Sequence, residues 1–511
     1  MKKILFSSIL LAGVNTPLLH AQTPANQTAV DLPEMVITAT RSVTPKKQLS
    51  AASTVYTRKD IERLQVKTLP ELLRGTTGLD MTQNGGLGTT TSVFMRGTNS
   101  DHVLVLVDGI KVGSVTLGTT PFEFVPIDQV ERVEIIRGPQ SSLYGSEAMG
   151  GVIQIFTRKG EDSEKPQFSL DAGGGSYDTY RTSGNVNGRW KNSWYSLGAS
   201  SIGTEGINAR QPIPGPFGFS QPDRDGYQNT AMNARAGHRF DNNAELEAFF
   251  IRAQGTNEFD ANFGGDHAAF ITQTVGVTGA LDVADNWRST LRLGQSLDKS
   301  DTFNADITNT LNSRFDSTRW NASWINEVAL SDNHKLILGS DYRLDEVDST
   351  TVYTEKSRYD VGVFGEYRGE IFENHFVNAS VRWDKNEQFG NYVSSNLGWR
   401  SNWDYGISTF ASFGNSFKAP SFNDLYYPNY GNRNLKPEES TSFEAGLAGN
   451  HDWGQWEIRA YHTNIDNLIT PVADQNFNYT AKNVGKSQID GLEAEIGTQW
   501  QGWNTKLNMT C

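Results

Sequence analysis

The sequence is poor in features on which several protein classes depend. Its single cysteine, Cys511, among 511 residues excludes an intrachain disulfide and a cysteine-based zinc or redox centre. No apolar run approaches the ~18 residues that a helical membrane span needs. Positive charge is scarce, since 45 Lys and Arg stand against 58 Asp and Glu, and this balance disfavours nucleic-acid binding. A transmembrane β-barrel is not excluded, because the average hydropathy of such barrels resembles that of soluble proteins.

Catalytic motifs are also missing. The sequence has no nucleophile elbow, no His-Glu-x-x-His motif and no paired histidines, and its eight histidines are scattered. The glycine-rich stretch Asn84-Gly85-Gly86-Leu87-Gly88 does not stand between a strand and a helix, and it lacks the Lys-Ser/Thr of a phosphate loop. We interpret it as a flexible or contact-making loop, and we expect no enzyme activity.

The first 48 residues contain two separate signals. Lys2 and Lys3 precede an apolar stretch that ends before Pro17, which predicts a secretory signal peptide over residues 1–21. Residues 22–48 form a polar tether around one extended hexad, Glu34, Met35, Val36, Ile37, Thr38 and Ala39. Alternating β-branched residues without a partner strand predict strand addition to the sheet edge of another protein. The other interpretation is the first strand of the next domain.

Residues 49–160 have the pattern of a small mixed α/β domain. Residues 105–107 and 130–137 are typical of strands that end in glycine-containing turns, and residues 152–156 form a last strand. Residues 60–64 and 68–73 are typical of short helices, the second with a threonine cap and a proline near its start.

Residues 161–511 repeat one plan of alternating strands. Val377, Ala379, Val381 and Trp383 line one face of a segment whose other face is polar, which is the period-two signature of a half-buried strand. Aromatic residues crowd the tight turns, as in the interfacial girdle of a membrane barrel. The eight tight turns lie at Lys191-Asn192, Asp241-Asn242-Asn243, Asp285-Asn286, Asp332-Asn333, Glu373-Asn374, Ser401-Asn402, His451-Asp452 and Gln501-Gly502.

Long polar loops alternate with these turns, at 204–226, 298–318, 416–440 and 463–488. A soluble β-sandwich or propeller does not need tryptophans at every turn on one side, so we predict a transmembrane antiparallel β-barrel. Strands in lipid cannot keep an open edge. Counting outward from the turns gives about 17 strands, an odd number, and we therefore expect a barrel whose final portion is missing.

This organisation resembles the TonB-dependent outer-membrane receptors. The plug signatures of that family are similar to Arg96-Gly97, Val107-Asp108-Gly109, Tyr144-Gly145-Ser146-Glu147-Ala148 and the segment from Val130 to Pro139. The barrel pattern is similar to Ser416-Phe417-Lys418-Ala419-Pro420 and Asn434-Leu435-Lys436-Pro437-Glu438. The resemblance implies 22 barrel strands, a plug domain at 49–160, an incomplete barrel at 161–511, and a TonB box at 34–39.

The resemblance also implies a function. Segments 82–86, 96–99 and 102–109 are similar to the plug of the cobalamin (vitamin B12) receptors within the family. This resemblance implies TonB-dependent uptake of cobalamin across the Gram-negative outer membrane, by a monomer embedded in lipid and lipopolysaccharide. TonB and its inner-membrane energising complex would supply the energy. A ferric-siderophore receptor remains the alternative, followed by an adhesin or a phage or colicin receptor without transport.

Three groups of residues follow as expected sites. The substrate would contact Thr82, Gln83, Asn84, Gly85, Gly86, Gly88, Ser114 and Thr116. Plug-to-barrel contacts are expected from Arg96, Arg132 and Arg137 to interior acids such as Glu366, Glu493 and Glu495. Asp223, Asp225 and Asp260 fall where outer loops of the cobalamin receptors hold calcium, which prefers several oxygen ligands. Solvated loop acids are the other interpretation of these three.

Overall fold

The computed structural model describes residues 35–36, 41–160, 164–213, 221–261, 265–304, 309–500 and 503–511. The expected signal peptide at 1–21 lies outside the described residues, as do the tether residues 22–34 and 37–40. Of the expected TonB box, Met35–Val36 is described. From Met35 onward the chain forms a single unit that contains both the small N-terminal domain and the large sheet.

Residues 41–160 fold into the expected mixed α/β domain, here called the plug. A five-stranded sheet of order β3-β8-β9-β6-β7 contains one parallel pair, β6 with β9, and β4 and β5 form a separate hairpin. The strands are β3 (Ala52–Thr57), β4 (Leu79–Gln83), β5 (Thr91–Met95), β6 (Val103–Val107), β7 (Ile110–Lys111), β8 (Val130–Arg137) and β9 (Gly151–Thr157). The helices are α1 (Arg58–Leu64), α2 (Leu69–Leu73) and α3 (Ser141–Tyr144), with short 3-10 turns at η1 (Lys46–Gln48), η2 (Ser100–His102), η3 (Phe122–Phe124) and η4 (Ile127–Gln129).

Local sequence explains these plug elements. Thr57 and Asp60 form a reciprocal capping box at the start of α1, and the Thr68 hydroxyl accepts the Glu71 backbone N–H at the start of α2. The apolar residues of both helices pack on the sheet in one core with the valines and isoleucines of β6, β8 and β9. The short helices and the strands predicted here are confirmed.

Two residues of the N-terminal hexad, Met35 and Val36, are described and have a partner strand. Met35–Val36 forms β1, which pairs antiparallel with β2 (Thr44–Pro45), so that Val36 lies opposite Thr44. The remaining residues of the hexad lie outside the described residues. Arg41, which lies between β1 and β2 in the sequence, has a φ of 55°, in the left-handed region.

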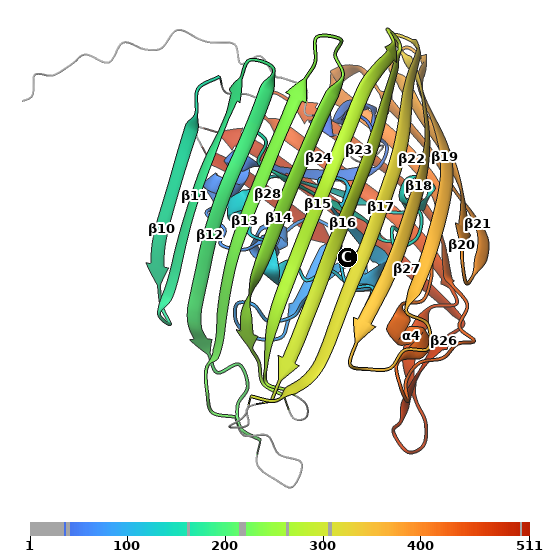
Figure 1. Cartoon of the computed structure of the whole chain (residues 1–511). Helices are drawn as coiled ribbons and strands as arrows, with labels where there is room; N and C mark the ends of the chain where they lie inside the picture. The colour runs from blue at the N-terminus through green and yellow to red at the C-terminus, as the bar shows by residue number, and fades with distance from the viewer. Residues whose placement is uncertain are drawn as a thin grey trace, which may run out of the picture. The chain divides into compact units, whose positions relative to one another are not determined.

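The second part of the chain forms one antiparallel sheet whose strand order follows the sequence. It contains 17 strands, as expected, with the hairpin of β25 and β26 inserted between β24 and β27. Figure 1 shows this sheet curving around the plug, with the tight turns at one end and the long connections, α4 (Phe422–Tyr426) and β26 at the other. The strands are β10 (Gln167–Gly175), β11 (Thr179–Trp190), β12 (Ser193–Ile207), β13 (Asp225–Arg239), β14 (Glu245–Glu258), β15 (His267–Ala284), β16 (Trp287–Phe303), β17 (Leu311–Ser331), β18 (His334–Ser349), β19 (Ser357–Phe372), β20 (His375–Asn386), β21 (Gly390–Asn402), β22 (Ile407–Lys418), β23 (Glu438–His451), β24 (Gly454–Asp466), β25 (Ile469–Ala473), β26 (Tyr479–Asn483), β27 (Lys486–Trp500) and β28 (Trp503–Thr510), with the turn η5 (Asp404–Gly406) between β21 and β22.

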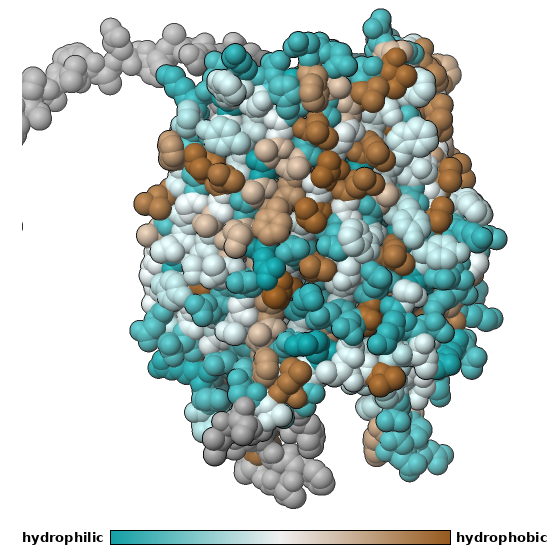
Figure 2. Space-filling model, in the orientation of Figure 1, coloured by the Kyte–Doolittle hydropathy of each residue, from teal (hydrophilic) through white to brown (hydrophobic). Residues whose placement is uncertain are grey.

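Side chains alternate between an apolar outer face and a polar inner face. On β20, Val381 and Trp383 are exposed while Arg382 and Asp384 are buried against the plug side. Figure 2 shows hydrophobic side chains gathered in a band over the upper and middle wall on the visible face, with hydrophilic residues at both ends. The arrangement is that of a transmembrane barrel wall around a polar, filled interior.

Two further details concern the connections between the strands. Gly173, Gly174 and Gly175 lie within β10, and the turn falls at Tyr177 and Asp178, both at positive φ. The long loops are shorter than predicted because strands such as β17 continue beyond the apolar band, where ladder pairing still satisfies the backbone.

Within the described residues, β10 pairs only with β11 and β28 only with β27, so these two strands are the edges of the sheet. No helix of the described chain has the length and apolar character needed to cross a membrane.

Candidate functional site at the interface of plug and barrel

An ionic cluster joins the plug to strands β23 and β27. Arg96, at the turn after β5, donates from Nε and Nη2 to the two carboxylate oxygens of Glu493, each at 2.8 Å, and from Nη1 to Glu444. Its guanidinium also stacks on the Tyr461 ring, 4.4 Å from the centroid. Arg137 lies 3.6 Å from Glu493 and donates to the Thr54 hydroxyl. The bidentate geometry makes this cluster, here called the Arg96 latch, a directional contact between plug and wall.

The close approach at the Arg96 latch depends on one glycine. A Cβ atom at Gly78 would clash with Oε1 of Glu493 and would lie 2.8 Å from Cδ of Arg137. Gly78 also has a φ of 72°, which side chains disfavour. The plug backbone can therefore meet the carboxylate only because this residue has no side chain.

The other residues expected at this interface have different partners. Arg132 is 2.7 Å from Glu134 on its own strand and stacks on Phe156, so its described partners belong to the plug, not to the barrel wall. Glu366 pairs with Arg368 on the same barrel strand. Glu495 accepts the Thr77 hydroxyl at 2.7 Å. Alternation along β8 places Arg132 on the opposite face of the strand from Arg137.

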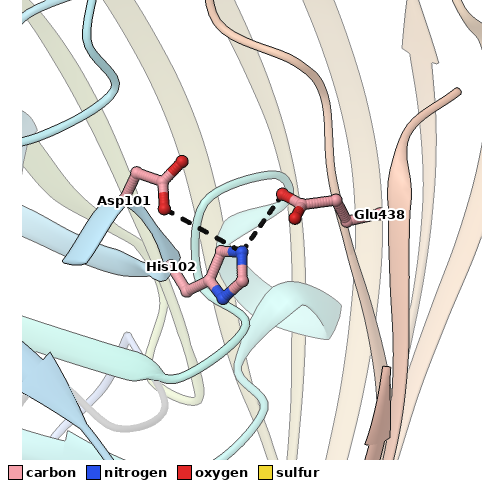
Figure 3. A group of neighbouring side chains, drawn as sticks. All are labelled: Asp101, His102 and Glu438. Carbon is pink, nitrogen blue, oxygen red and sulfur yellow. Dashed lines mark hydrogen bonds and ion pairs between the residues drawn. The ribbon is translucent and has the colours of Figure 1, made fainter. Parts of the chain in front are cut away.

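A second cluster, missed by sequence reasoning, lies at η2 (Figure 3). The His102 ring is fully buried, with Nε2 3.1 Å from Glu438, and its Nδ1 faces the Asn99 backbone N–H at 3.3 Å. Asp101, His102 and Glu438 come close enough to hold a metal ion. The Lys418 ammonium, however, lies 2.6 Å from Asp101 and 3.0 Å from Glu438. A lysine already neutralises the acids, so we interpret the cluster as a plug-to-wall contact.

The segment after the hexad is anchored to the wall. Arg41 donates from both terminal nitrogens to Asp341 on β18, at 2.7 and 2.9 Å. Its guanidinium lies between the rings of Tyr144 and Phe364, 4.6 and 4.8 Å from their centroids. A few residues after the hexad, Arg41 therefore attaches the chain to both the plug and the barrel wall.

The plug carries two acids whose environments act in opposite directions. Burial by itself would raise the pKa of Glu147, but Arg319 and Arg343 outweigh it and lower this pKa to about 2. Burial raises the pKa of Glu123 to about 8, although its carboxylate accepts the Thr91 backbone N–H. Nearby, Tyr227 and Asn229 of β13 donate to the backbone carbonyls of Glu123 and Phe124. Ion pairs therefore hold the plug to β17 and β18 at Glu147, and hydrogen bonds to backbone carbonyls hold it to β13 at Glu123 and Phe124.

The expected substrate contacts divide into an exposed group and a covered group. Residues 84–90 form the tip of the β4–β5 hairpin, where Asn84 and Gly85 are exposed, and Thr82, on β4 just before the tip, is exposed as well. Gly86 and Gly88 lie against Ile207 and the Tyr227 ring at the long-connection ends of β12 and β13. The Gln83 side chain donates to the Gly86 carbonyl.

Ser114 and Thr116 form the covered group. They are 8% and 2% exposed, and their hydroxyls lie 2.9 Å apart. The backbone of Asn423 in α4 donates to the Thr116 carbonyl, and Phe422 packs on Val115. Both residues are buried, and α4 lies against the segment that contains them, so the structure does not place them on the open surface.

The three loop acids lie near one another. Burial raises the pKa of Asp260, and repulsion from Asp225 and Asp223 adds to this effect. The Asp225 carboxylate also accepts the Ala209 backbone N–H at 2.9 Å. Three mutually repelling carboxylates in one outer loop region have the oxygen chemistry that suits calcium.

Comparison with known proteins identifies the family. The TonB-dependent receptor plug domain matches residues 45–152, and the TonB dependent receptor-like β-barrel matches residues 161–510. The chain belongs to the TonB-dependent receptor family. The receptor is thus an outer-membrane transport protein and not an enzyme.

Curated relatives extend along most of the receptor. The vitamin B12 transporter BtuB of Photobacterium profundum is 33% identical over 472 residues, which cover 91% of the receptor and 75% of that protein. The protein of the same name from Vibrio cholerae serotype O1 is 34% identical over 514 residues, covering 96% of the receptor and 79% of that protein.

Solved structures share the fold. A mutant form of the ferric enterobactin receptor PfeA of Pseudomonas aeruginosa superposes with a TM-score of 0.79 at 21% identity, covering 93% of the receptor and 81% of that chain. The siderophore receptor PirA of Pseudomonas aeruginosa gives a TM-score of 0.73 at 19% identity, covering 90% and 85%.

Proposed function

We propose that the receptor takes up cobalamin. The observation that carries this proposal is the identity of 33% and 34% to two vitamin B12 transporters over more than nine-tenths of the receptor. The likeness to the ferric enterobactin receptor and to the siderophore receptor PirA is 21% and 19% in identity and supports only the shared fold. The exposed hairpin tip at Thr82, Asn84 and Gly85 would present the ligand-binding surface, where small residues let backbone amides approach a bulky chelate.

Uptake of labelled ligands by cells without their own receptors tests the cargo. Cells that produce the receptor are expected to accumulate labelled cyanocobalamin and to exclude ferric enterobactin. Asn84→Leu should weaken cobalamin binding about tenfold, since one polar contact is lost. Asp80→Asn, on the same hairpin but away from its tip, serves as the matched control. Entry of the siderophore without cobalamin would overturn the proposal.

Energy would enter through the hexad. In this proposal, ligand binding releases β1 from β2, and the freed strand adds to an edge of TonB. The pairing of Val36 with Thr44 supports the proposal because a segment that pairs once as a strand can pair again with another edge. Traction on the segment would then act first on the Arg41 anchor at Asp341 and afterwards on the plug. Small domains rest on ~5–15 kcal/mol of stability, which mechanical work can overcome.

Calcium would order the outer loops through Asp223, Asp225 and Asp260. Their mutual repulsion is removed when a divalent cation binds between them. Calcium titration of the receptor by calorimetry should give a saturable heat, which Asp260→Asn weakens at least about tenfold. Asp404→Asn, an exposed acid at the opposite, tight-turn end, is the matched control. Equal calcium binding by both variants would exclude the site.

A further inference from the structure

An internal cavity of about 110 Å³ lies between the plug and the middle of the barrel wall. Its plug side is formed around the turn at Gly109 and by Lys111 and Tyr144, and its wall side by β16 to β20. These strands are central in the 17-stranded sheet, so neither sheet edge contributes to the cavity. The space is large enough for a few water molecules or one small ion.

The lining of this cavity is mostly cationic. Five basic side chains face it, against two acidic ones, Asp341 and Asp360. The basic side chains are Arg41, Lys111, Arg292, Arg343 and Arg382. Three further acids, Glu147, Asp345 and Asp384, pair with Arg343 or Arg382 from outside the lining. The acids therefore stand mainly behind the arginines, while the cationic groups face the space.

Two of the five cations have no acidic partner among the described residues. Arg41, Arg343 and Arg382 each form ion pairs. Lys111 is 9% exposed, and its ammonium donates to the Tyr144 carbonyl at 2.5 Å. Arg292 donates to the Thr278 hydroxyl at 3.3 Å. Neither Lys111 nor Arg292 forms an ion pair with a carboxylate in the part of the chain that the structure describes.

The plug turn is shaped around Arg292. A Cβ atom at Gly109 would clash with Nη1 of Arg292, so this glycine makes room for the guanidinium. The guanidinium therefore reaches across from β16 to the plug backbone beside the cavity. Guanidinium and ammonium groups are the usual donors to phosphate oxygens. A guanidinium group can donate two parallel hydrogen bonds, and an ammonium group binds as a compact positive charge.

We propose that this cavity is a binding site for a small oxyanion of the phosphate class, held by Lys111 and Arg292 with Arg343 beside them. A buried cation without a counter-ion is unfavourable, and an oxyanion between the two unmatched cations removes that cost. The oxyanion is either a free inorganic ion or a phosphate ester group carried by a passing cargo. The site stands on the cavity and its charges and does not depend on the proposed cobalamin cargo.

The protonation of Lys111 supports this site. Burial, followed by repulsion from Arg343, lowers its pKa to about 7, and Glu147 opposes the shift. The charged groups that face or influence its ammonium come from the N-terminal segment, the plug and four wall strands: Arg41, Glu147, Arg292, Asp341, Arg343, Asp360, Arg382 and Asp384. An anion in the cavity would favour the protonated amine, so binding should take up a proton near neutral pH.

Calorimetric titration of the full chain in detergent micelles tests the site. Inorganic phosphate and dimethyl phosphate, at constant ionic strength in chloride, are the two probes. Binding of inorganic phosphate alone assigns the site to the free ion, and binding of both assigns it also to a phosphate ester of a cargo. Binding of neither overturns the proposal.

Variants localise the binding. Lys111→Met and Arg292→Gln are each expected to weaken phosphate binding at least about tenfold, because each removes a charge-assisted hydrogen bond. Arg288→Gln is the matched control, since Arg288 lies on the same strand but pairs with Asp282 and Glu245 outside the cavity. Two variants are used so that a folding defect in one leaves the other informative. Undiminished binding in both would place the ion elsewhere and overturn the proposal.

Sulfate separates the titration of Lys111 from that of the ligand, because its charge is constant near neutral pH. The affinity for sulfate should fall about tenfold between about pH 6.5 and pH 8, as Lys111 with its pKa of about 7 loses its proton. Lys111→Met should abolish this pH dependence. A sulfate affinity that is equal at both pH values would overturn the role assigned to Lys111.

Discussion

Val36→Pro is expected to abolish energised uptake while ligand binding at the cell surface stays normal. Proline has no backbone N–H, so a strand that contains it loses one ladder hydrogen bond. A pairing bond lost and left unmet costs ~1–3 kcal/mol, which lowers the affinity for a partner strand by about tenfold or more. Val36 is a suitable position for this test because it already pairs with Thr44 in the structure. In the proposal, the same residue leaves β2 and pairs with a strand of TonB.

The measurement is ligand binding and ligand accumulation in the same cells. Val36→Thr keeps both the N–H group and the β-branched side chain, and it should transport normally. Accumulation by the Val36→Pro receptor at the level of Val36→Thr would show that the hexad is not used as a strand. Loss of surface binding in the proline variant would point instead to a defect in folding.

Arg96→Met is expected to destabilise the docking of the plug by ~3–5 kcal/mol, because Glu444 and Glu493 remain buried without their shared cation. The methionine fills similar space but cannot donate hydrogen bonds. Hydrogen exchange of the β5 and β8 amides should accelerate by about a hundredfold or more, since β5 leads directly into Arg96 and β8 ends at Arg137. Exchange is the suitable measurement because it reports the plug apart from the barrel.

Two further variants decide the interpretation of the Arg96 result. Adding Glu493→Gln to Arg96→Met should restore part of the lost protection, because the second change removes the buried carboxylate that has lost its bidentate partner and keeps only Arg137 at 3.6 Å. Arg63→Met removes an exposed pair with Asp60 and should change exchange very little. If Arg96→Met behaves like Arg63→Met, the latch makes no net contribution to docking.

Much of the fold follows from local pattern. The alternation of Val381 and Trp383 with Arg382 and Asp384 predicted which face of β20 meets the plug, because the side-chain period of a strand is two. The tight turns located the strand ends, and their count gave the 17 strands observed. The caps at Thr57 and Thr68 act within three residues, so they too are visible in the sequence.

The site was only partly predictable. Arg96 was expected to meet an interior acid, but its second partner, Glu444, is 348 residues away, and many inward-facing acids satisfy the same pattern. The burial of Ser114 and Thr116, and the contact of α4 with this segment from about 300 residues farther along the chain, were not visible in the sequence. The pairing of Val36 with Thr44 is a contact within the polar tether that the sequence pattern did not reveal.

By itself the sequence determined the two-part construction of this receptor, its strands and the polar character of its barrel interior. These properties follow from interactions between residues a few positions apart, or from the side of a strand on which a residue lies. Tertiary structure alone decided which charges meet, which plug loops stay open and where cations are left unmatched around a cavity. Curling one sheet around another domain brings many distant pairs within reach, and only packing selects among them.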